Sequence, residues 1–222
     1  MPDRLAFYSY AHVPWLSGNG QRGYKDADLP TGEAKRNQYE RGKKLLAEVG
    51  YQEIGMDHFA LPSDSLAVAM ESGELHRNFM GYTASKTQLM AGLGASSISD
   101  SWYSFAQNVK GLEEYQHLVA NNIIPIYRGH ILTDEDRVIR KHILNLMCRF
   151  ETVLNENEAA FFDMSLVLEK LKEMERDQLI EIISNKISVT EKGRPFVRNV
   201  CMALDMHLYR KEPETRLFSM TV

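Results

Sequence analysis

The chain has 222 residues, of which 44% are hydrophobic and 25% are charged, a composition typical of a globular protein with a sizeable core. Its formal net charge of −4 argues against bulk attraction to nucleic acid or to an anionic membrane surface, so we expect neither as a partner. No apolar run approaches the length of a membrane-spanning helix. The N-terminal residues lack the charged and apolar segments of a signal peptide, and the cytoplasm is the expected location.

The two cysteines, Cys148 and Cys201, restrict the metal chemistry of this chain. An iron–sulfur cluster needs more thiolates than two, and zinc sites usually combine closely spaced Cys or His pairs. Both cysteines fall on the apolar stripes of predicted helices. We therefore expect two small core residues, with no disulfide and no metal ligand in this chain.

The first part of the chain alternates strand and helix patterns. Apolar and aromatic residues from Arg4 to Tyr10 predict a buried strand, and a loop rich in glycine and proline follows over residues 11–30. Thr31 is a suitable N-cap for a helix that stops at Gly50, and a short strand is expected over 51–54. This order predicts a βαβ unit in a parallel sheet.

A second helix is expected from Ser63 to Glu71. Residues 74–110 alternate glycines and hydroxyl residues with short apolar runs, and they predict no helix before Leu112–Asn121. Such irregular segments often carry the chemistry of a barrel or an open sheet.

The pattern changes near residue 130. Thr133 and Asp136 predict the capped start of a helix with an apolar stripe up to Phe150, and a second amphipathic helix is expected around 164–174. Residues 179–189 predict a β-hairpin. A closing helix is expected from Thr190, which gives the order of a small winged-helix-like domain. We place the boundary between Tyr127 and Thr133, with domains at 1–130 and 131–222.

Four short blocks contain residues suited to chemistry. The first, Tyr10 to Pro14, ends the predicted first strand, where α/β barrels place substrates and cofactors, although a structural strand end would look the same. The second holds the adjacent pair Asp57 and His58. This pair could serve as an acid–base pair or as metal ligands, but neighbours on an extended chain point to opposite faces, and a structural role is the alternative.

The third block, His76 to Thr83, is dense in hydrogen-bonding groups. Its Arg77 could hold a carboxylate by a two-pronged contact, or it could be a solvated arginine. The fourth block, Gly92 to Ser99, begins like a dinucleotide-binding loop but lacks the third glycine and the following helix. Its glycines indicate backbone that approaches other backbone closely.

The order of these blocks resembles that in oxygen-independent coproporphyrinogen III oxidase. The matching segments are Tyr10–Pro14, Lys25–Pro30, Gly50–Ala60, Leu75–Thr83, Arg128–Gly129, Leu132–Thr133, Val189–Arg194 and Arg198–Met202. The resemblance covers the chain from just before Arg4 to about Leu208. The blocks at 54–60 and 78–83 distinguish it from the related radical-SAM-like haem chaperones. One departure is Met80, where the family usually has a glutamine, so a hydrogen-bonding amide is lost.

The resemblance implies an α/β fold: the C-terminal part of a partial TIM-type barrel, followed by a small winged-helix-like, mainly helical domain. It implies an oxidoreductase of haem biosynthesis that decarboxylates two propionates of coproporphyrinogen III to vinyl groups, giving protoporphyrinogen IX. In the family, a 4Fe–4S cluster reduces S-adenosylmethionine, and the resulting radical abstracts a hydrogen from each propionate.

The family's cluster motif, Cys-x-x-x-Cys-x-x-Cys, lies upstream of the matched region and is absent from this chain. We therefore expect an N-terminal cluster-binding half and an unidentified electron donor as partners, and no activity from this chain alone. Two family contacts to S-adenosylmethionine map here, at Ala11 and Ile98. No catalytic residue is assigned. The substrate carries four carboxylates, and from charge alone the candidate cations are Arg22, Lys25, His58 and Arg77.

Two functions of other classes remain as alternatives. The first is nucleic-acid binding through the winged-helix-like domain, but residues 177–211 contain six Lys and Arg against four acids, a small surplus beside the basic stripes of DNA readers. The second is haem carriage, by analogy with the chaperones, through His58 or His76.

Overall fold

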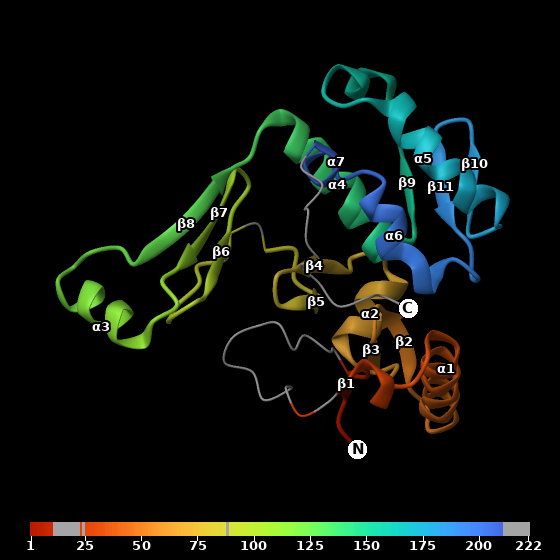
Figure 1. Cartoon of the computed structure of the whole chain (residues 1–222), viewed down its shortest axis with the longest axis horizontal. Helices are drawn as coiled ribbons and strands as arrows, with labels where there is room; N and C mark the ends of the chain where they lie inside the picture. Colours follow the sequence, from red (N-terminus) through yellow and green to blue (C-terminus); the bar gives the residue numbers. More distant parts are fainter. Residues whose placement is uncertain (11–22, 24, 88, 211–222) are drawn as a thin grey trace. The chain divides into compact units, whose positions relative to one another are not determined.

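The computed structural model describes residues 1–10, 23, 25–87 and 89–210 (Figure 1). These residues form two compact units, one of Met1–Val68 together with the chain from His207 onward, and one of Ala69–Met206. Each unit is a mixture of helices and short strands, as the expected α/β class requires. The division into domains near residue 130 is a different partition and stays a prediction.

The first unit contains a three-stranded antiparallel sheet. Strand β1 (Arg4–Ala6) and strand β2 (Gln52–Gly55) both pair with β3 (His58–Ala60), so the order is β1-β3-β2. Helix α1 (Gly32–Glu48) connects β1 to β2, and Thr31 caps it by accepting a hydrogen bond from the Ala34 backbone N–H at 3.3 Å, as predicted.

The predicted parallel pairing is wrong for this unit. Strands β1 and β2 run in the same direction, but β3 lies between them and pairs antiparallel with both. The cause is a tight turn in which Met56 and Asp57 adopt positive φ angles of 23° and 66°, which folds β3 back onto β2. All strand pairs in the described parts of the chain are antiparallel.

The first strand is also shorter and more exposed than predicted. It ends at Ala6, and only Leu5 within it is half-buried. Among the described strands β1 has one neighbour, β3, so it lies at the edge of this sheet. The core of this unit lies instead on β2, β3 and the start of α2 (Ser65–Glu71), with Ile54, Phe59, Ala60, Leu66 and Ala67 almost fully buried.

The second unit contains residues 74–110, for which the sequence predicted no helix. These residues form short strands. Strands β4 (His76–Asn78) and β5 (Gly81–Thr83) make a hairpin. Strands β6 (Ile98–Asp100), β7 (Ser104–Asn108) and β8 (Ile126–Ile131) form an antiparallel sheet in that order. Helix α3 (Leu112–Ala120) connects β7 to β8, close to its predicted bounds, and lies at the end of these strands away from α4 (Figure 1).

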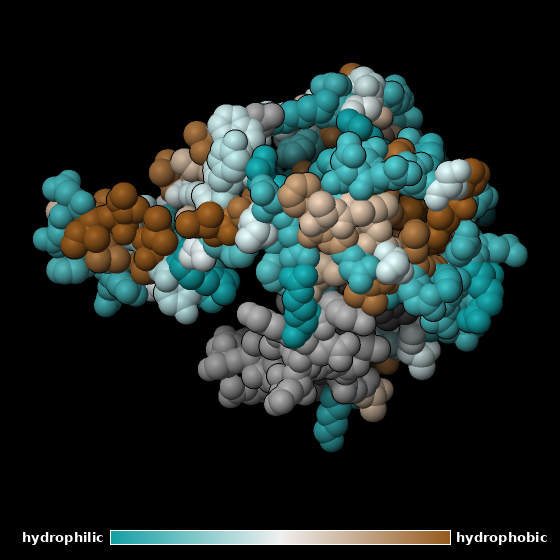
Figure 2. All heavy atoms as spheres, turned by 90° about the horizontal axis from the view of Figure 1, so that it is seen from above, coloured by the Kyte–Doolittle hydropathy of each residue, from teal (hydrophilic) through white to brown (hydrophobic). Residues whose placement is uncertain are grey.

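Apolar side chains are exposed around α3 and β8. All six residues of β8 are exposed, and apolar side chains gather near the α3 end of this sheet (Figure 2). The exposed apolar residues of this part are Leu112, Val119, Ile123, Ile124, Ile126, Tyr127 and Ile131. Among the described helices, none combines the length and the apolar character needed to cross a membrane.

The rest of the second unit follows the predicted order closely. Helix α4 (Asp134–Arg149) begins with the predicted capping box, in which Thr133 and Asp136 bond each other's backbone N–H. Strand β9 (Glu151–Val153) and helix α5 (Met164–Arg176) precede the predicted hairpin of β10 (Ile180–Ile183) and β11 (Lys186–Val189). Strand β11 also pairs with β9.

The closing helix is broken, contrary to the prediction of one helix from Thr190. Helix α6 spans Val197–Met202 after a 3-10 turn, and α7 spans Met206–Arg210. Thr190 forms a turn instead, in which its hydroxyl donates to the Gln178 carbonyl and accepts from the Gly193 N–H at 3.0 Å. Pro195 has no backbone N–H to donate, and Arg194–Phe196 form a 3-10 turn before α6 begins.

The cysteines are buried core residues, as predicted. Cys148 on α4 and Cys201 on α6 are free thiols, each 8% exposed. Burial raises the pKa of Cys148 to about 11 and that of Cys201 to about 12, and the nearby Arg77 opposes this only weakly. Both therefore stay protonated at neutral pH and act as apolar side chains.

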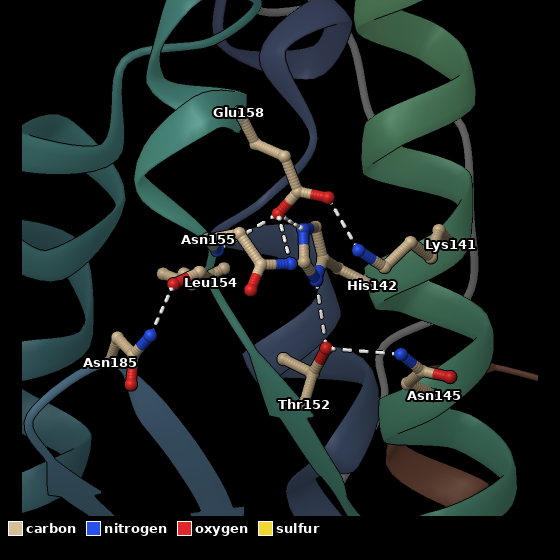
Figure 3. Close-up of polar contacts among 8 residues, drawn as sticks. All are labelled: Lys141, His142, Asn145, Thr152, Leu154, Asn155, Glu158 and Asn185. Atoms are coloured by element: carbon tan, nitrogen blue, oxygen red, sulfur yellow. Dashed lines mark hydrogen bonds and ion pairs between the residues drawn. The ribbon is translucent and has the colours of Figure 1, made fainter.

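A histidine on α4 joins three elements of this unit through buried hydrogen bonds (Figure 3). His142 is fully buried; its Nδ1 lies 2.8 Å from the Thr152 hydroxyl on β9, and its Nε2 lies 3.1 Å from the Glu158 carboxylate. Since a carboxylate only accepts, Nε2 carries the proton and Nδ1 accepts from Thr152. Glu158 also bonds Lys141 and the Asn155 N–H, so this network fixes the 3-10 segment Glu156–Ala160 against α4.

We expect mild acid to destabilise the fold through His142. Burial lowers the pKa of its ring below the ordinary value of 6.5, with only partial compensation from Glu158, so the unfolded chain binds the proton more readily. Stability is then present above pH about 6.5 and falls as the pH drops below it. Urea unfolding at pH about 7.5 and about 5.5 measures this loss. His142→Gln should flatten the dependence, whereas the exposed His117→Gln should leave it unchanged; equal slopes in all three proteins would contradict the assignment.

Candidate functional site

The fourth block of the sequence forms a closely bonded loop in front of β6. The side chain of Asn108, at the end of β7, donates from Nδ2 to the carbonyls of Gly92 and Gly94 at 3.1 and 2.9 Å. The Gly92 N–H donates to the Ser99 hydroxyl, and the Gly94 N–H donates to the Tyr115 hydroxyl, both at 3.0 Å. The loop is therefore tied to β6, β7 and α3, and it holds Ile98 at the first position of β6.

The loop approaches the backbone of Ile98 so closely that a side chain would not fit at Gly92. A Cβ atom built there would lie 2.7 Å from the Ile98 carbonyl oxygen and 3.0 Å from its nitrogen. Carbon and backbone atoms do not approach to 2.7 Å without displacement. The prediction of closely approaching backbone in this block is confirmed, and Ile98 itself is half-buried.

The other end of β6 is fixed by a partly buried ion pair. Arg140 of α4 donates from Nη2 to Asp100 at 2.7 Å and from Nη1 to the Ser101 carbonyl at 2.9 Å. Its guanidinium also lies 5.0 Å from the centre of the Phe105 ring on β7. The side chain of Phe105 in turn packs edge-on against Phe79, which is exposed near the tip of the β4–β5 hairpin.

His76 lies in the same group of charges. Burial lowers the pKa of its ring, Arg140 lowers it further, and Asp100 partly opposes both. The ring is therefore mainly neutral at pH 7. A neutral imidazole can accept a proton or a hydrogen bond, which suits a polar contact to a substrate better than attraction of a carboxylate by charge.

Arg77 points inward from β4. Its guanidinium lies over the Tyr82 ring, 4.6 Å from the ring centre, and it is close enough to Cys148 and Cys201 to influence both thiols. Its Nη1 is buried and has no hydrogen-bond partner among the described residues. Arg77 is therefore not a fully solvated arginine. Its hydrogen bonds within the described residues do not use all of its donors either, because Nη1 is left over.

The remaining candidates belong to the first unit. His58 begins β3, and its Nδ1 lies 2.8 Å from the Met56 carbonyl across the turn. Asp57 sits in that turn rather than on an extended strand, and its carbonyl accepts from the Phe7 N–H. Lys25 is exposed beside the 3-10 turn Asp26–Asp28. Ala11 and Arg22 lie outside the described residues, so their relation to Ile98 stays untested.

Three residues of this region were not found from the sequence: Asn108, Asp100 and Arg140. An asparagine near the end of a strand is usually read as a turn residue, and this was the only signal that Asn108 offered. Arg140 lies among other charged residues on α4. Nothing in the sequence pairs it with Asp100, 40 positions earlier.

Comparison with known proteins gives a consistent result. The chain is 41% identical over 217 residues to the oxygen-independent coproporphyrinogen III oxidase of Salmonella typhimurium, covering 95% of this chain and 47% of the relative. The corresponding protein of Escherichia coli is 40% identical over the same length, and that of Synechocystis is 35% identical over 230 residues, covering all of this chain. No family model matches.

A solved structure has the same fold. The chain superposes with a TM-score of 0.84 and 39% identity on coproporphyrinogen III oxidase from Escherichia coli, described as a radical SAM enzyme, over 94% of this chain and 49% of that one. The fold is therefore that of part of a radical SAM enzyme. Within that class, the chain is related over nearly its whole length to the oxygen-independent coproporphyrinogen III oxidases and matches their C-terminal half. It spans about half the length of these relatives.

The close approach at Gly92 yields a direct test. Gly92→Ala should displace the Ile98 backbone and lower the free energy of unfolding by about 2 kcal/mol, the usual cost of overpacking. Gly111→Ala is the matched control, because a Cβ there meets only Glu114 atoms at an ordinary 3.6 Å. Urea unfolding of the two variants provides the measurement. Equal free energies of unfolding for the two variants would show that the loop adjusts to the added methyl group without a loss of stability.

Proposed function

We propose that this chain supplies the C-terminal half of a radical SAM oxidoreductase that decarboxylates two propionates of coproporphyrinogen III to vinyl groups, giving protoporphyrinogen IX. The observation that carries the proposal is the agreement of both sequence and fold with the solved Escherichia coli structure, at 39% identity and a TM-score of 0.84 over 94% of the chain. Since the chain spans about half of its relatives, the cluster-binding half and an electron donor are the further components of the proposal.

The chain's own residues fit S-adenosylmethionine better than they fit a cluster. The two cysteines are buried and protonated and are too few for a 4Fe–4S centre, so we assign no cluster chemistry to this chain. The loop before β6 offers a half-buried apolar Ile98 and a close, rigid backbone, which suit an adenosyl group. Ile98 and Ala11 are the residues proposed to hold it. When bound, S-adenosylmethionine supplies the oxidising power of the reaction.

The proposed domains follow from the same relation. Residues 1–130 would form the last part of a partial TIM-type barrel. Residues 131–222 would form a winged-helix-like domain, which the order α4, β9, α5, β10, β11 and α6 supports. Exposed Lys25 and half-buried His58, together with Arg22 and Arg77, are the proposed cations for the substrate carboxylates.

A chimera tests the function directly. The unmatched N-terminal half of the Escherichia coli oxidase, fused to this chain, should convert coproporphyrinogen III under anaerobic, reducing conditions with S-adenosylmethionine. Fluorescence of the product after oxidation to protoporphyrin measures turnover. This chain alone and the N-terminal half alone are the controls and should show none. A folded, cluster-loaded chimera without turnover, or turnover by the isolated chain, would contradict the proposal.

Because Arg77 has an unused donor, a substitution there can distinguish a role in substrate binding from a role in packing. In the chimera, Arg77→Met removes the charge but keeps an apolar side chain against Tyr82, and we expect KM for coproporphyrinogen III to rise about tenfold, the loss typical of a charged hydrogen bond. Arg176→Met, at an exposed site on α5, is the control. An unchanged KM together with a lower melting temperature would assign Arg77 to packing alone.

A further inference from the structure

The amide of Asn108 is the only side chain in the described region that bonds two carbonyls of the loop before Ile98. Its Nδ2 carries two hydrogens, and these match the two acceptors, Gly92 and Gly94. Its backbone N–H donates to the Ser97 carbonyl at 2.9 Å, so three positions of the loop depend on one residue. Asn108 is 7% exposed, which makes these bonds costly to leave unmade.

The ladder between β7 and β8 is irregular beside Asn108. The register with β8 shifts between Gln107 and Asn108, so that Gln107 lies opposite Arg128 whereas Asn108 lies opposite Ile126. The extra residue, Tyr127, lies on β8, so β7 itself continues without interruption to Asn108. Gln107, one position earlier, donates from Nε2 to the Ser96 carbonyl at 3.0 Å and supports the same loop from its exposed side.

The position of Ile98 follows from these bonds. The loop brings Gly92 into contact with the Ile98 backbone, and the β6–β7 ladder fixes Ile98 opposite Gln107. Because the Arg140–Asp100 pair holds the other end of β6, the strand cannot move away as a unit. A loss of the Asn108 bonds would therefore change the place of Ile98 while the rest of the sheet remains.

We propose that Asn108 is a positioning residue for S-adenosylmethionine: it acts through the Gly92–Ser97 loop to set the place of Ile98. This rests on the proposed function, in which Ile98 contacts that cosubstrate. Asn108 sets the affinity for S-adenosylmethionine and leaves the affinity for the tetra-acid substrate nearly unchanged. A residue needed only for folding would not separate the two affinities.

The test uses the chimera described above, loaded with its cluster. Asn108→Asp keeps the size of the side chain but replaces the double donor with an acceptor facing two carbonyls. We expect the dissociation constant for S-adenosylmethionine, measured by equilibrium dialysis with labelled cosubstrate, to rise about tenfold. KM for coproporphyrinogen III and kcat at saturating cosubstrate should change less than about twofold. Asn121→Asp is the matched control, because the exposed side chain of Asn121 donates to the His117 carbonyl of the adjoining helix α3.

Tyr115→Phe gives a second, milder variant that removes only the hydroxyl accepting the Gly94 N–H. It should raise the same dissociation constant about threefold, and it decides the matter if Asn108→Asp does not fold. Unchanged cosubstrate affinity in either folded variant, or equal losses for both ligands, overturns the positioning role while the proposed function stands. If the unmodified, folded chimera binds no S-adenosylmethionine, the proposed function fails and the positioning role fails with it.

Discussion

The candidate site depends on strand β6 being held at both ends. Asn108 fixes the loop that leads into it, and the partly buried Arg140–Asp100 pair fixes the end. The second contact joins the sheet to helix α4, which is in turn joined to β9 and the following 3-10 segment through His142. A chain of specific polar contacts therefore runs from the loop to the centre of the second unit. Apolar burial alone would not determine the register of so short a strand.

Local signals in the sequence predicted the helices and the last hairpin well. Thr31 and Thr133 cap helices where expected, since an N-cap bond involves residues only three positions apart. The hairpin of β10 and β11 and the burial of both cysteines also followed from local periodicity. The break before α6 did not, because the role of Thr190 depends on the Gln178 and Leu179 carbonyls across the hairpin.

Long-range pairing could not be predicted in this way. The position of β3 between β1 and β2 results from the backbone angles at Met56 and Asp57, and these residue types do not predict such angles. Asn108 and Arg140 act on partners 14 to 40 positions away. The proposed role of Ile98 came from the order of short blocks along the chain, and no physical property of that isoleucine distinguishes it from any other half-buried residue.

The segment Val189–Arg194, one of the blocks that carry the family resemblance, has a packing explanation of its own. A Cβ at Gly193 would lie 1.8 Å from the Leu179 carbonyl oxygen, and the Thr190 hydroxyl closes the same turn. Any sequence that keeps this hairpin-to-helix junction must place glycine at 193, whatever reaction it catalyses. Agreement at this glycine therefore reflects the packing of the shared junction, and evidence about chemistry has to come from the segments around Ile98.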